Sequence, residues 1–298
     1  MEGAGGKRAA RSAGGKGAAR SAGPLARLLE LLELERLDRD LFLGNPGRGE
    51  GRLFGGMVAA QSVIAAGRTV EPGMLHSLHG YFLRPGSHEA PIRFVVDRIR
   101  DGRSFTTRRV VAHQGGEAIF SLAASFARTE EGISHQDPMP EAPDPESLPD
   151  WEDVRAGILG DPSLRRRDSA VELRMCDPEG FAGEAKPPRQ SVWLRPRGAL
   201  PDDPLLNAAL LVYASDRTLI NTAARPHGLP WGKRVAASLD HAFWLHRPAR
   251  FDDWVLYASV SPAAHAARGL VFGAMYRRRD GALIASSAQE GLIRVPRR

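Results

Sequence analysis

The sequence predicts an α+β protein built from two similar units, each an apolar helix followed by several antiparallel strands. The chain has 298 residues, enough for two domains with hydrophobic cores. Apolar residues make up 42% and charged residues 26%, as in an average globular protein. An order of helix and then strands occurs twice along the chain. The longest uncharged stretch, 53–67, is shorter than the roughly 20 apolar residues that span a bilayer, so we expect no transmembrane helix.

Residues 1–23 predict a disordered basic tail. They are almost entirely Gly, Ala, Ser, Lys and Arg, and apart from Met1 they offer no large apolar side chain to offset the entropy of ordering. Lys and Arg outnumber Asp and Glu by 41 to 35, and most of this excess lies in the first 27 residues. The tail has no aromatic residue, so we expect nonspecific attraction to anions and no specific binding of nucleic acid.

The first unit is expected over residues 24–128. Pro24 suits a first helical turn, and leucines follow it at i, i+3, i+4 and i+7 spacing, which predicts a short amphipathic helix. The apolar stretch 53–66 predicts a buried helix, and its Gly-Gly pair allows close backbone packing. Four segments rich in β-branched or aromatic residues predict antiparallel strands at 75–83, 92–99, 105–112 and 118–127.

The second unit is expected over residues 151–298, after a linker at 129–150 that holds five prolines and seven acidic residues. An apolar helix is predicted over 205–220. Strands are predicted at 171–174, 192–195, 235–246, 253–261, 268–277 and 282–294. Ser77-Leu78-His79 in the first unit matches Ser238-Leu239-Asp240 in the second, which supports a duplication.

Several common site signatures are missing from the sequence. We find no GxSxG nucleophile elbow, phosphate-binding GxxxxGK[ST] loop, HExxH pair or GxGxxG after a strand. No acid or cysteine accompanies the pairs His76/His79 and His241/His246 at ligand spacing, so we interpret these histidines as packed strand residues. Cys176 is the only cysteine, which fits a reducing compartment, and we interpret it as a bystander rather than a nucleophile.

Asp216 is the ionisable residue that fits its sequence surroundings least. It shares a predicted helical face with Val212 and Ala209 and so lies on the apolar side of the helix. A carboxylate in such a place needs partners, and misfits of this kind are often functional. A structural alternative is that Asp216 pairs with Arg217 or caps a helix that begins after Ser215. The spacing alone does not decide between the two.

Two strand residues of the second unit are candidate partners for Asp216. Ser238 lies on the first strand after the helix and is expected to share a face with Asp240. Gln289 lies on the last strand among small residues that leave room beside it. Each of them, taken singly, is an ordinary strand residue.

A set of short motifs resembles the type II acyl-CoA thioesterases, the double-hotdog enzymes that include bacterial TesB-like and mammalian peroxisomal proteins. The segments that carry the resemblance are Leu53-Phe54-Gly55-Gly56, His76-Ser77-Leu78-His79-Gly80-Tyr81-Phe82, Asp101-Gly102-Arg103-Ser104-Phe105, Ser238-Leu239-Asp240-His241, Arg268-Gly269-Leu270-Val271 and Ala288-Gln289-Glu290-Gly291-Leu292-Ile293-Arg294. Together they cover most of the chain after the tail.

The resemblance implies a double hotdog, in which each unit is a curved antiparallel sheet wrapped round one long helix. It also implies hydrolysis of acyl-CoA to a free acid and CoA, with no cofactor and no metal. The catalytic trio that it implies consists of Asp216, Ser238 and Gln289. These residues would hold and activate a water, and an amide near a helix start would stabilise the oxyanion.

The resemblance leaves two other functions open. One is a hotdog hydroxyacyl-thioester dehydratase, which needs a His and an acid together, although the first helix offers only Gln61 where an acid would sit. The other is a non-catalytic acyl-CoA-binding protein. We expect a homo-oligomer, because relatives are often oligomeric. The chain ends Val295-Pro296-Arg297-Arg298 rather than in a Ser-Lys-Leu tripeptide, which predicts a cytoplasmic rather than a peroxisomal location.

Overall fold

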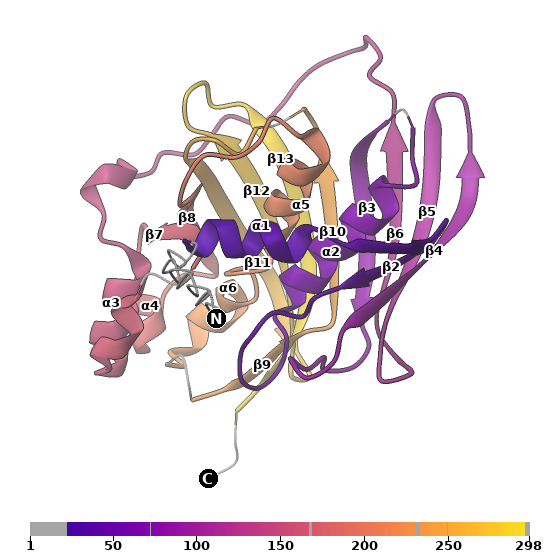
Figure 1. Cartoon of the computed structure of the whole chain (residues 1–298). Coiled ribbons are helices and arrows are strands. Elements are labelled where there is room, and N and C mark those ends of the chain that lie inside the picture. Colours follow the sequence, from indigo (N-terminus) through magenta and orange to yellow (C-terminus); the bar gives the residue numbers. More distant parts are fainter. Residues whose placement is uncertain (1–22, 72, 167–168, 231–232, 249, 296–298) are drawn as a thin grey trace, which may run out of the picture.

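The structure is a computed structural model, and it describes residues 23–71, 73–166, 169–230, 233–248 and 250–295 (Figure 1). The tail predicted at 1–23 falls outside these residues except for Gly23. Within the described ranges, no helix is long and apolar enough to cross a membrane.

One antiparallel sheet of 13 strands forms the body of the protein. Its middle pair is β3 (Met74–Phe82) and β10 (Asp240–Leu245). Outward from β3 lie β6 (Glu117–Ala127), β5 (Phe105–Gln114), β4 (Ile92–Asp101), β2 (Leu41–Gly44) and β1 (Glu35–Asp38). Outward from β10 lie β13 (Leu283–Arg294), β12 (Arg268–Arg277), β11 (Val255–His265), β8 (Arg189–Pro196) and β7 (Val171–Met175), and β9 (Val235–Ser238) also pairs with β13. The strands on the two sides of the middle pair therefore follow a matching sequence order.

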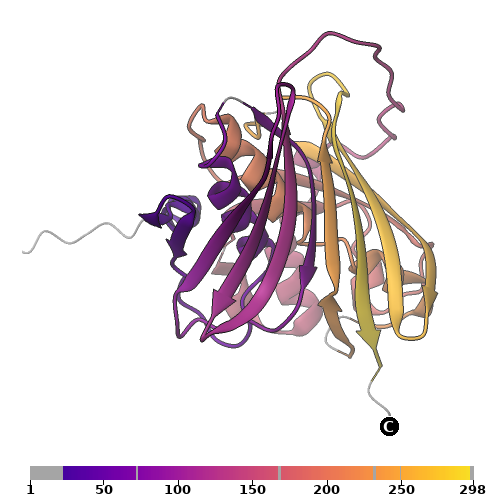
Figure 2. The same ribbon diagram turned by 90° about the vertical axis from the view of Figure 1, so that its right-hand side faces the viewer.

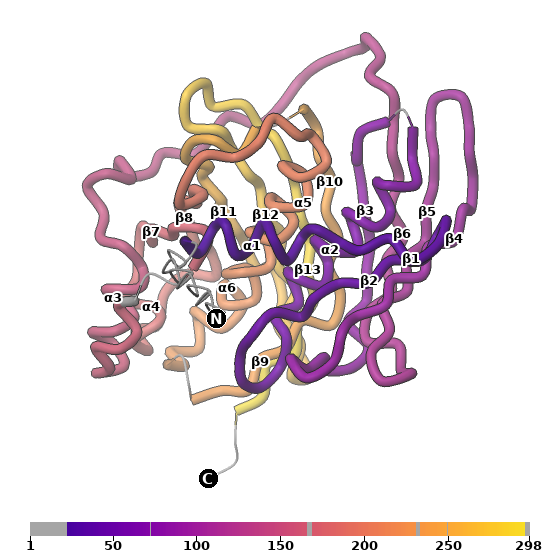
Figure 3. The backbone as a smooth tube through the Cα atoms, viewed as in Figure 1, coloured from indigo at the N-terminus to yellow at the C-terminus, as the bar shows by residue number. Residues whose placement is uncertain are grey.

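Two helices, α2 (Gly55–Gly67) and α5 (Pro204–Ser215), pack on one face of this sheet. Figure 2 shows the opposite face, with the strands in front of the helices. Both helices are apolar on nearly all sides and therefore buried on nearly all sides. The short helix α1 (Pro24–Leu32), in the foreground of Figure 3, buries Leu25, Leu28 and Leu32 in the core beside α2.

α2 and α5 run antiparallel and touch along a contact that we call the helix seam. At the start of α2, a Cβ added to Gly56 would stand 2.8 Å from the carbonyl oxygen of Tyr213, near the end of α5. At the end of α2, a Cβ added to Gly67 would stand 2.3 Å from the side chain of Leu205, near the start of α5. Glycine therefore lets the two backbones touch at the start of α2 and makes room for the Leu205 side chain at its end.

Buried and exposed side chains alternate along the strands, as expected for a sheet that is covered on one face. In β4, Ile92, Phe94 and Val96 are buried, whereas Arg93 and Val95 are exposed on the outer face. All strands predicted from the sequence are present, with ends that differ by a few residues. The predicted strand 235–246 is two strands, because β9 and β10 separate at Leu239.

The helix predicted over 205–220 is wrong at its end, because α5 ends at Ser215 and Asp216 is its C-cap. The Ser215 hydroxyl donates to the Val212 carbonyl over 2.8 Å, and short polar side chains of this kind compete with the helical backbone. A tight turn follows, in which the amide of Asn221 donates to the Thr218 carbonyl. α6 (Asn221–Ala224) comes after this turn.

Several elements were not predicted. β1 is four residues long and exposed throughout, so it has no apolar alternation that could reveal it. α3 (Trp151–Leu159) and α4 (Glu179–Ala182) lie where the sequence offered no clear period. In the stretch predicted as a linker, 129–144 forms no helix or strand, and the Pro143 carbonyl accepts a hydrogen bond from Trp193 Nε1 over 2.8 Å.

We predict that Gly56→Ala destabilises the protein by about 1–3 kcal/mol, because the added methyl group would meet the backbone carbonyl of Tyr213. Gly67→Ala is the matched control, since it meets only the end of the Leu205 side chain, which can rotate away. Thermal unfolding of both variants checks this. Equal melting temperatures for the two variants would contradict the role given to the helix seam.

Candidate active site

The start of α2 meets the end of α5 at one end of the helix seam. A Cβ added to Gly55 would stand 2.6 Å from the Phe82 ring and 3.1 Å from Asp216 Oδ2. A side chain here would clash with the Phe82 ring and crowd the carboxylate, so glycine suits this close approach. At the other end of the seam, a small apolar cavity of about 40 Å³ lies around Leu205.

The structure brings the three predicted site residues together. Asp216 comes from the end of α5, Ser238 from the end of β9 and Gln289 from the middle of β13. Ser238 Oγ donates to Asp216 Oδ1 over 3.2 Å, and Gln289 Nε2 donates to the same oxygen over 2.6 Å. Asp216 and Ser238 are half-buried, whereas Gln289 is fully buried. The local pairing of Asp216 with Arg217, the structural alternative, is not found among the described residues.

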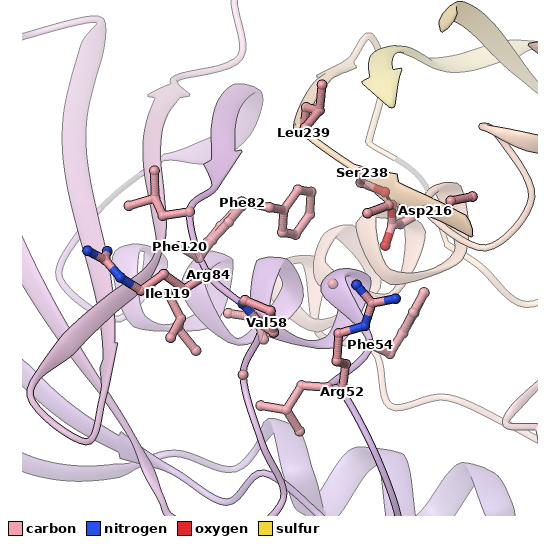
Figure 4. Close-up of a pocket in the computed structure, with 17 residues that line it drawn as sticks. Arg52, Phe54, Val58, Phe82, Arg84, Ile119, Phe120, Asp216, Ser238 and Leu239 are labelled. Atoms are coloured by element: carbon pink, nitrogen blue, oxygen red, sulfur yellow. Dashed lines mark hydrogen bonds between the residues drawn. The ribbon is translucent and has the colours of Figure 1, made fainter. Parts of the chain in front are cut away.

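Asp216 and Ser238 line a pocket of about 390 Å³ (Figure 4). Its other walls are mostly apolar. The first half of the chain supplies Leu53, Phe54, Val58, Phe82, Ile119 and Phe120, and the second half adds Ala236, Ala237 and Leu239. Figure 4 shows the Arg52 guanidinium directed toward Asp216 and Ser238, whereas Arg84 points away from them. Gln289 does not line the pocket and contacts Asp216 from the interior. The pocket is thus built from both halves of the chain.

The Asp216 carboxylate lies between two helix ends of opposite polarity. The end of α5 carries partial negative charge and disfavours a carboxylate, whereas the start of α2 carries partial positive charge and favours it. Asp216 Oδ1 receives both hydrogen bonds described above, while Oδ2 accepts none from the described part of the chain and faces Gly55. Oδ2 is therefore the oxygen left to accept a proton.

Gly55, the first residue of α2, lies beside this oxygen. The first amides of a helix have no acceptor within the helix, and Phe54 at the N-cap position provides no side-chain cap. The amide of Met57 bonds to the Phe54 carbonyl over 3.1 Å. The amides of Gly55 and Gly56, the first two of α2, are thus donors left without an acceptor in the helix.

Ser238 reaches this site because the strand bulges. Ser238 pairs with Gly291 of β13, and Ala242 pairs with Ala288, so one extra residue lies between these pairs on the β9–β10 side. The bulge places Ser238 and His241 on the inner face with Gln289. The expectation that Ser238 shares a face with Asp240 is therefore wrong, because it assumed an unbroken strand.

His241 is the residue that the sequence analysis undervalued. Its side chain is 1% exposed, and both ring nitrogens have partners, as expected for a packed strand histidine. One of these partners is Gln289, which joins the ring to the proposed site. The alternation of His241, Phe243 and Leu245 as inward residues is the sequence signal that could have placed it there.

Other reactive groups lie outside this arrangement. Burial raises the pKa of the Cys176 thiol to about 11, so the thiol is protonated near neutral pH and is a poor nucleophile. Within the residues that the structure describes, no group of three or more His, Cys, Asp or Glu side chains could hold a metal ion.

Comparisons with known proteins agree with this fold. The family described as acyl-CoA thioesterase matches residues 165–292, and the acyl-CoA thioesterase N-terminal domain matches residues 45–127. The chain is 38% identical to acyl-coenzyme A thioesterase 8 of Mus musculus, over 89% of this chain and 88% of that protein.

Solved structures extend the comparison. An acyl-CoA thioesterase II, TesB2, from Mycobacterium marinum is 42% identical, covers 90% of this chain and 97% of its own, and superposes with a TM-score of 0.76. A hot dog fold protein from Alicyclobacillus acidocaldarius, only 19% identical, covers 91% of this chain and 98% of its own with a TM-score of 0.74, which shows the fold alone. The predicted hotdog fold and the resemblance to type II enzymes are confirmed: the chain belongs to the acyl-CoA thioesterase family.

Proposed function

We propose that this protein hydrolyses acyl-CoA to a free carboxylic acid and CoA, with water as the nucleophile. The observation that carries the proposal is the position of Asp216, which faces the pocket with one carboxylate oxygen while Ser238 and Gln289 hold the other. Membership of the acyl-CoA thioesterase family supports the same substrate class.

In the proposed reaction, Asp216 Oδ2 accepts a proton from a water as the water oxygen attacks the thioester carbonyl. The Ser238 hydroxyl hydrogen and one amide hydrogen of Gln289 are directed to Oδ1, and the other amide hydrogen faces His241 Nδ1. What the two side chains offer a water is therefore acceptor lone pairs. Gln289 Oε1 is buried and has no partner among the described side chains, and a water O–H would satisfy it. A water held through its hydrogens keeps a lone pair free for attack.

Collapse of the tetrahedral intermediate breaks the carbon–sulfur bond, and the proton taken by Asp216 passes to the departing CoA thiolate. The developing oxyanion needs donors that are already in place. We propose the amides of Gly55 and Gly56, because they lie at the positive end of α2 beside Asp216.

Two kinds of group would bind the substrate: the apolar walls of the pocket and a cationic side chain. The side chains of Phe54, Val58 and Phe82 suit the uncharged part of a thioester. Arg52 is exposed at the pocket and has no acidic partner in the described structure, so we propose that it attracts the phosphates of CoA. Arg84 is ion-paired with Glu117 at 3.0 Å and is directed elsewhere.

The geometry gives no support to the dehydratase alternative. That reaction needs an imidazole that reaches the substrate, whereas His241 is fully buried behind Gln289. Non-catalytic binding of acyl-CoA is excluded if purified protein releases a thiol from acyl-CoA. Absence of release across short, medium and long acyl chains would overturn the proposed hydrolysis and favour binding alone.

We also propose that the two halves form a double hotdog that arose by duplication, with units at 24–128 and 151–298 joined by 129–150. The matching strand order on the two sides of β3 and β10 supports this. A cytoplasmic location is proposed because Cys176 is a free thiol, which fits a reducing compartment. Fractionation of cells that express the full chain tests the location.

We propose that the protein forms a homo-oligomer through the outer face of its sheet. An apolar row with one histidine crosses five neighbouring strands there: Val260, Phe272, Ala288, Ala242 and His79. Val260 and Phe272 are exposed, although large side chains of this type are usually buried. Sedimentation velocity at micromolar concentration should show an oligomer that Phe272→Glu weakens, and a wild-type monomer would contradict the proposal.

We predict that Asp216→Asn lowers kcat about 100-fold or more, because the amide cannot accept the proton from water. A thiol-release assay measures this, with thermal unfolding as a check on folding. Cys176→Ser is the control and should keep wild-type activity. Unchanged kcat in Asp216→Asn would contradict the assignment, and loss of activity in Cys176→Ser would point to a thiol nucleophile.

We predict that Arg52→Ala raises KM for acyl-CoA about fivefold at low salt, with kcat nearly unchanged, because an exposed charge contributes up to about 1 kcal/mol. The effect should shrink as salt screens the charge. Arg84→Ala is the matched control and should leave KM unchanged. Equal effects of the two substitutions would argue against a specific role for Arg52.

A further inference from the structure

A buried chain of hydrogen bonds runs from the backbone of α5 to Asp216. Ser215 Oγ donates to the Val212 carbonyl over 2.8 Å and lies 2.8 Å from His241 Nε2. His241 Nδ1 lies 3.1 Å from Gln289 Nε2, which in turn donates to Asp216 Oδ1. Ser215 and Gln289 are both 0% exposed, so protein groups and not solvent determine these bonds.

The direction of every bond in this chain follows from its first member. The Val212 carbonyl can only accept, so the single hydroxyl hydrogen of Ser215 is directed to it. Ser215 Oγ must then accept from His241, which places the ring hydrogen on Nε2. His241 Nδ1 is consequently an acceptor, and the group facing it must be the NH₂ of Gln289 rather than its oxygen.

We propose that His241 is a positioning residue that fixes the amide orientation of Gln289 and, through it, the Asp216 carboxylate. This inference rests on the proposed role of Asp216. With Nδ1 as acceptor, Gln289 directs Nε2 to Asp216 and keeps Oε1 free. A ring that carried its hydrogen on Nδ1 would attract Oε1 instead, and Oε1 facing Asp216 would repel the carboxylate.

The groups packed around His241 keep its imidazole ring neutral. Burial lowers the pKa of His241, while the carboxylates of Asp216 and Asp240 act in the opposite direction. On β11, the hydroxyl of Tyr257 bonds to the Ser215 carbonyl and to Ser287, and burial raises its pKa, so it too is neutral. On β3, Gly80 lies opposite His241 and brings no charge.

The first test compares His241→Leu with His241→Asn. The two new side chains have nearly the same shape, but only Asn can place an acceptor near the position of Nδ1. We expect His241→Leu to lower kcat about tenfold with little change in KM, as for one lost hydrogen bond, and His241→Asn to lose clearly less. His246→Gln, at a histidine bonded to Ser286 outside the site, is the matched control and should keep wild-type kcat. Equal loss in the Leu and Asn variants would overturn the proposal.

A double-variant cycle tests whether His241 acts through Gln289. In a Gln289→Ala background, His241→Leu should cause no further loss of kcat, because the group that it orients is gone. Full multiplication of the two losses would show that His241 acts by another route and would contradict the proposal.

The tautomer can be read without substrate and without any variant at position 241. In wild-type protein labelled with ¹⁵N-histidine, one ring should remain neutral with its hydrogen on Nε2 throughout the stable pH range, and Ser215→Ala should perturb that ring and lower kcat. The proposal would be overturned if the ring that responds to Ser215→Ala carried its hydrogen on Nδ1 or became protonated near neutral pH. Wild-type activity in Asp216→Asn would instead refute the proposed function and leave this measurement valid.

Discussion

The antiparallel contact between α2 and α5 is the constraint on which the rest of the arrangement depends. Because the helices run in opposite directions, the start of one meets the end of the other, and glycine lets the backbones touch. This brings the start of α2, from the first half of the chain, to the Asp216 carboxylate of the second half. The sheet then supplies Ser238 and Gln289 from β9 and β13, two strands that pair with each other.

The polar side chains beneath the pocket cost free energy to bury, and the stability of the fold alone does not explain their presence. Burying His241, Gln289, Ser215 and Tyr257 in an apolar core is tolerated only because each is hydrogen-bonded. Replacing one of these residues would leave its partners without a hydrogen bond and destabilise the core. We therefore expect substitutions at these positions to occur together. The same bonds leave Gln289 Oε1 buried without a partner in the described structure.

Much of the fold followed from local patterns, because long apolar helices and alternating strands leave clear periods in the sequence. Asp216 also stood out locally, as a carboxylate on the apolar face of the predicted helix. The role of His241 could not be read in the same way, because it depends on a bulge at Leu239 and on a partner 48 residues away. The end of α5 was missed because Ser215 and Asp216 are bound by distant strands, and helix periodicity does not register such bonds.

The helix seam has two ends, and only one of them carries the polar residues. At the other, Gly67 and Leu205 close the gap and leave a small apolar cavity. In a dimer of identical chains, any substitution at one end would be copied at the other by symmetry. Joining both halves in one polypeptide removes that coupling, so selection can improve catalysis at one end and packing at the other independently.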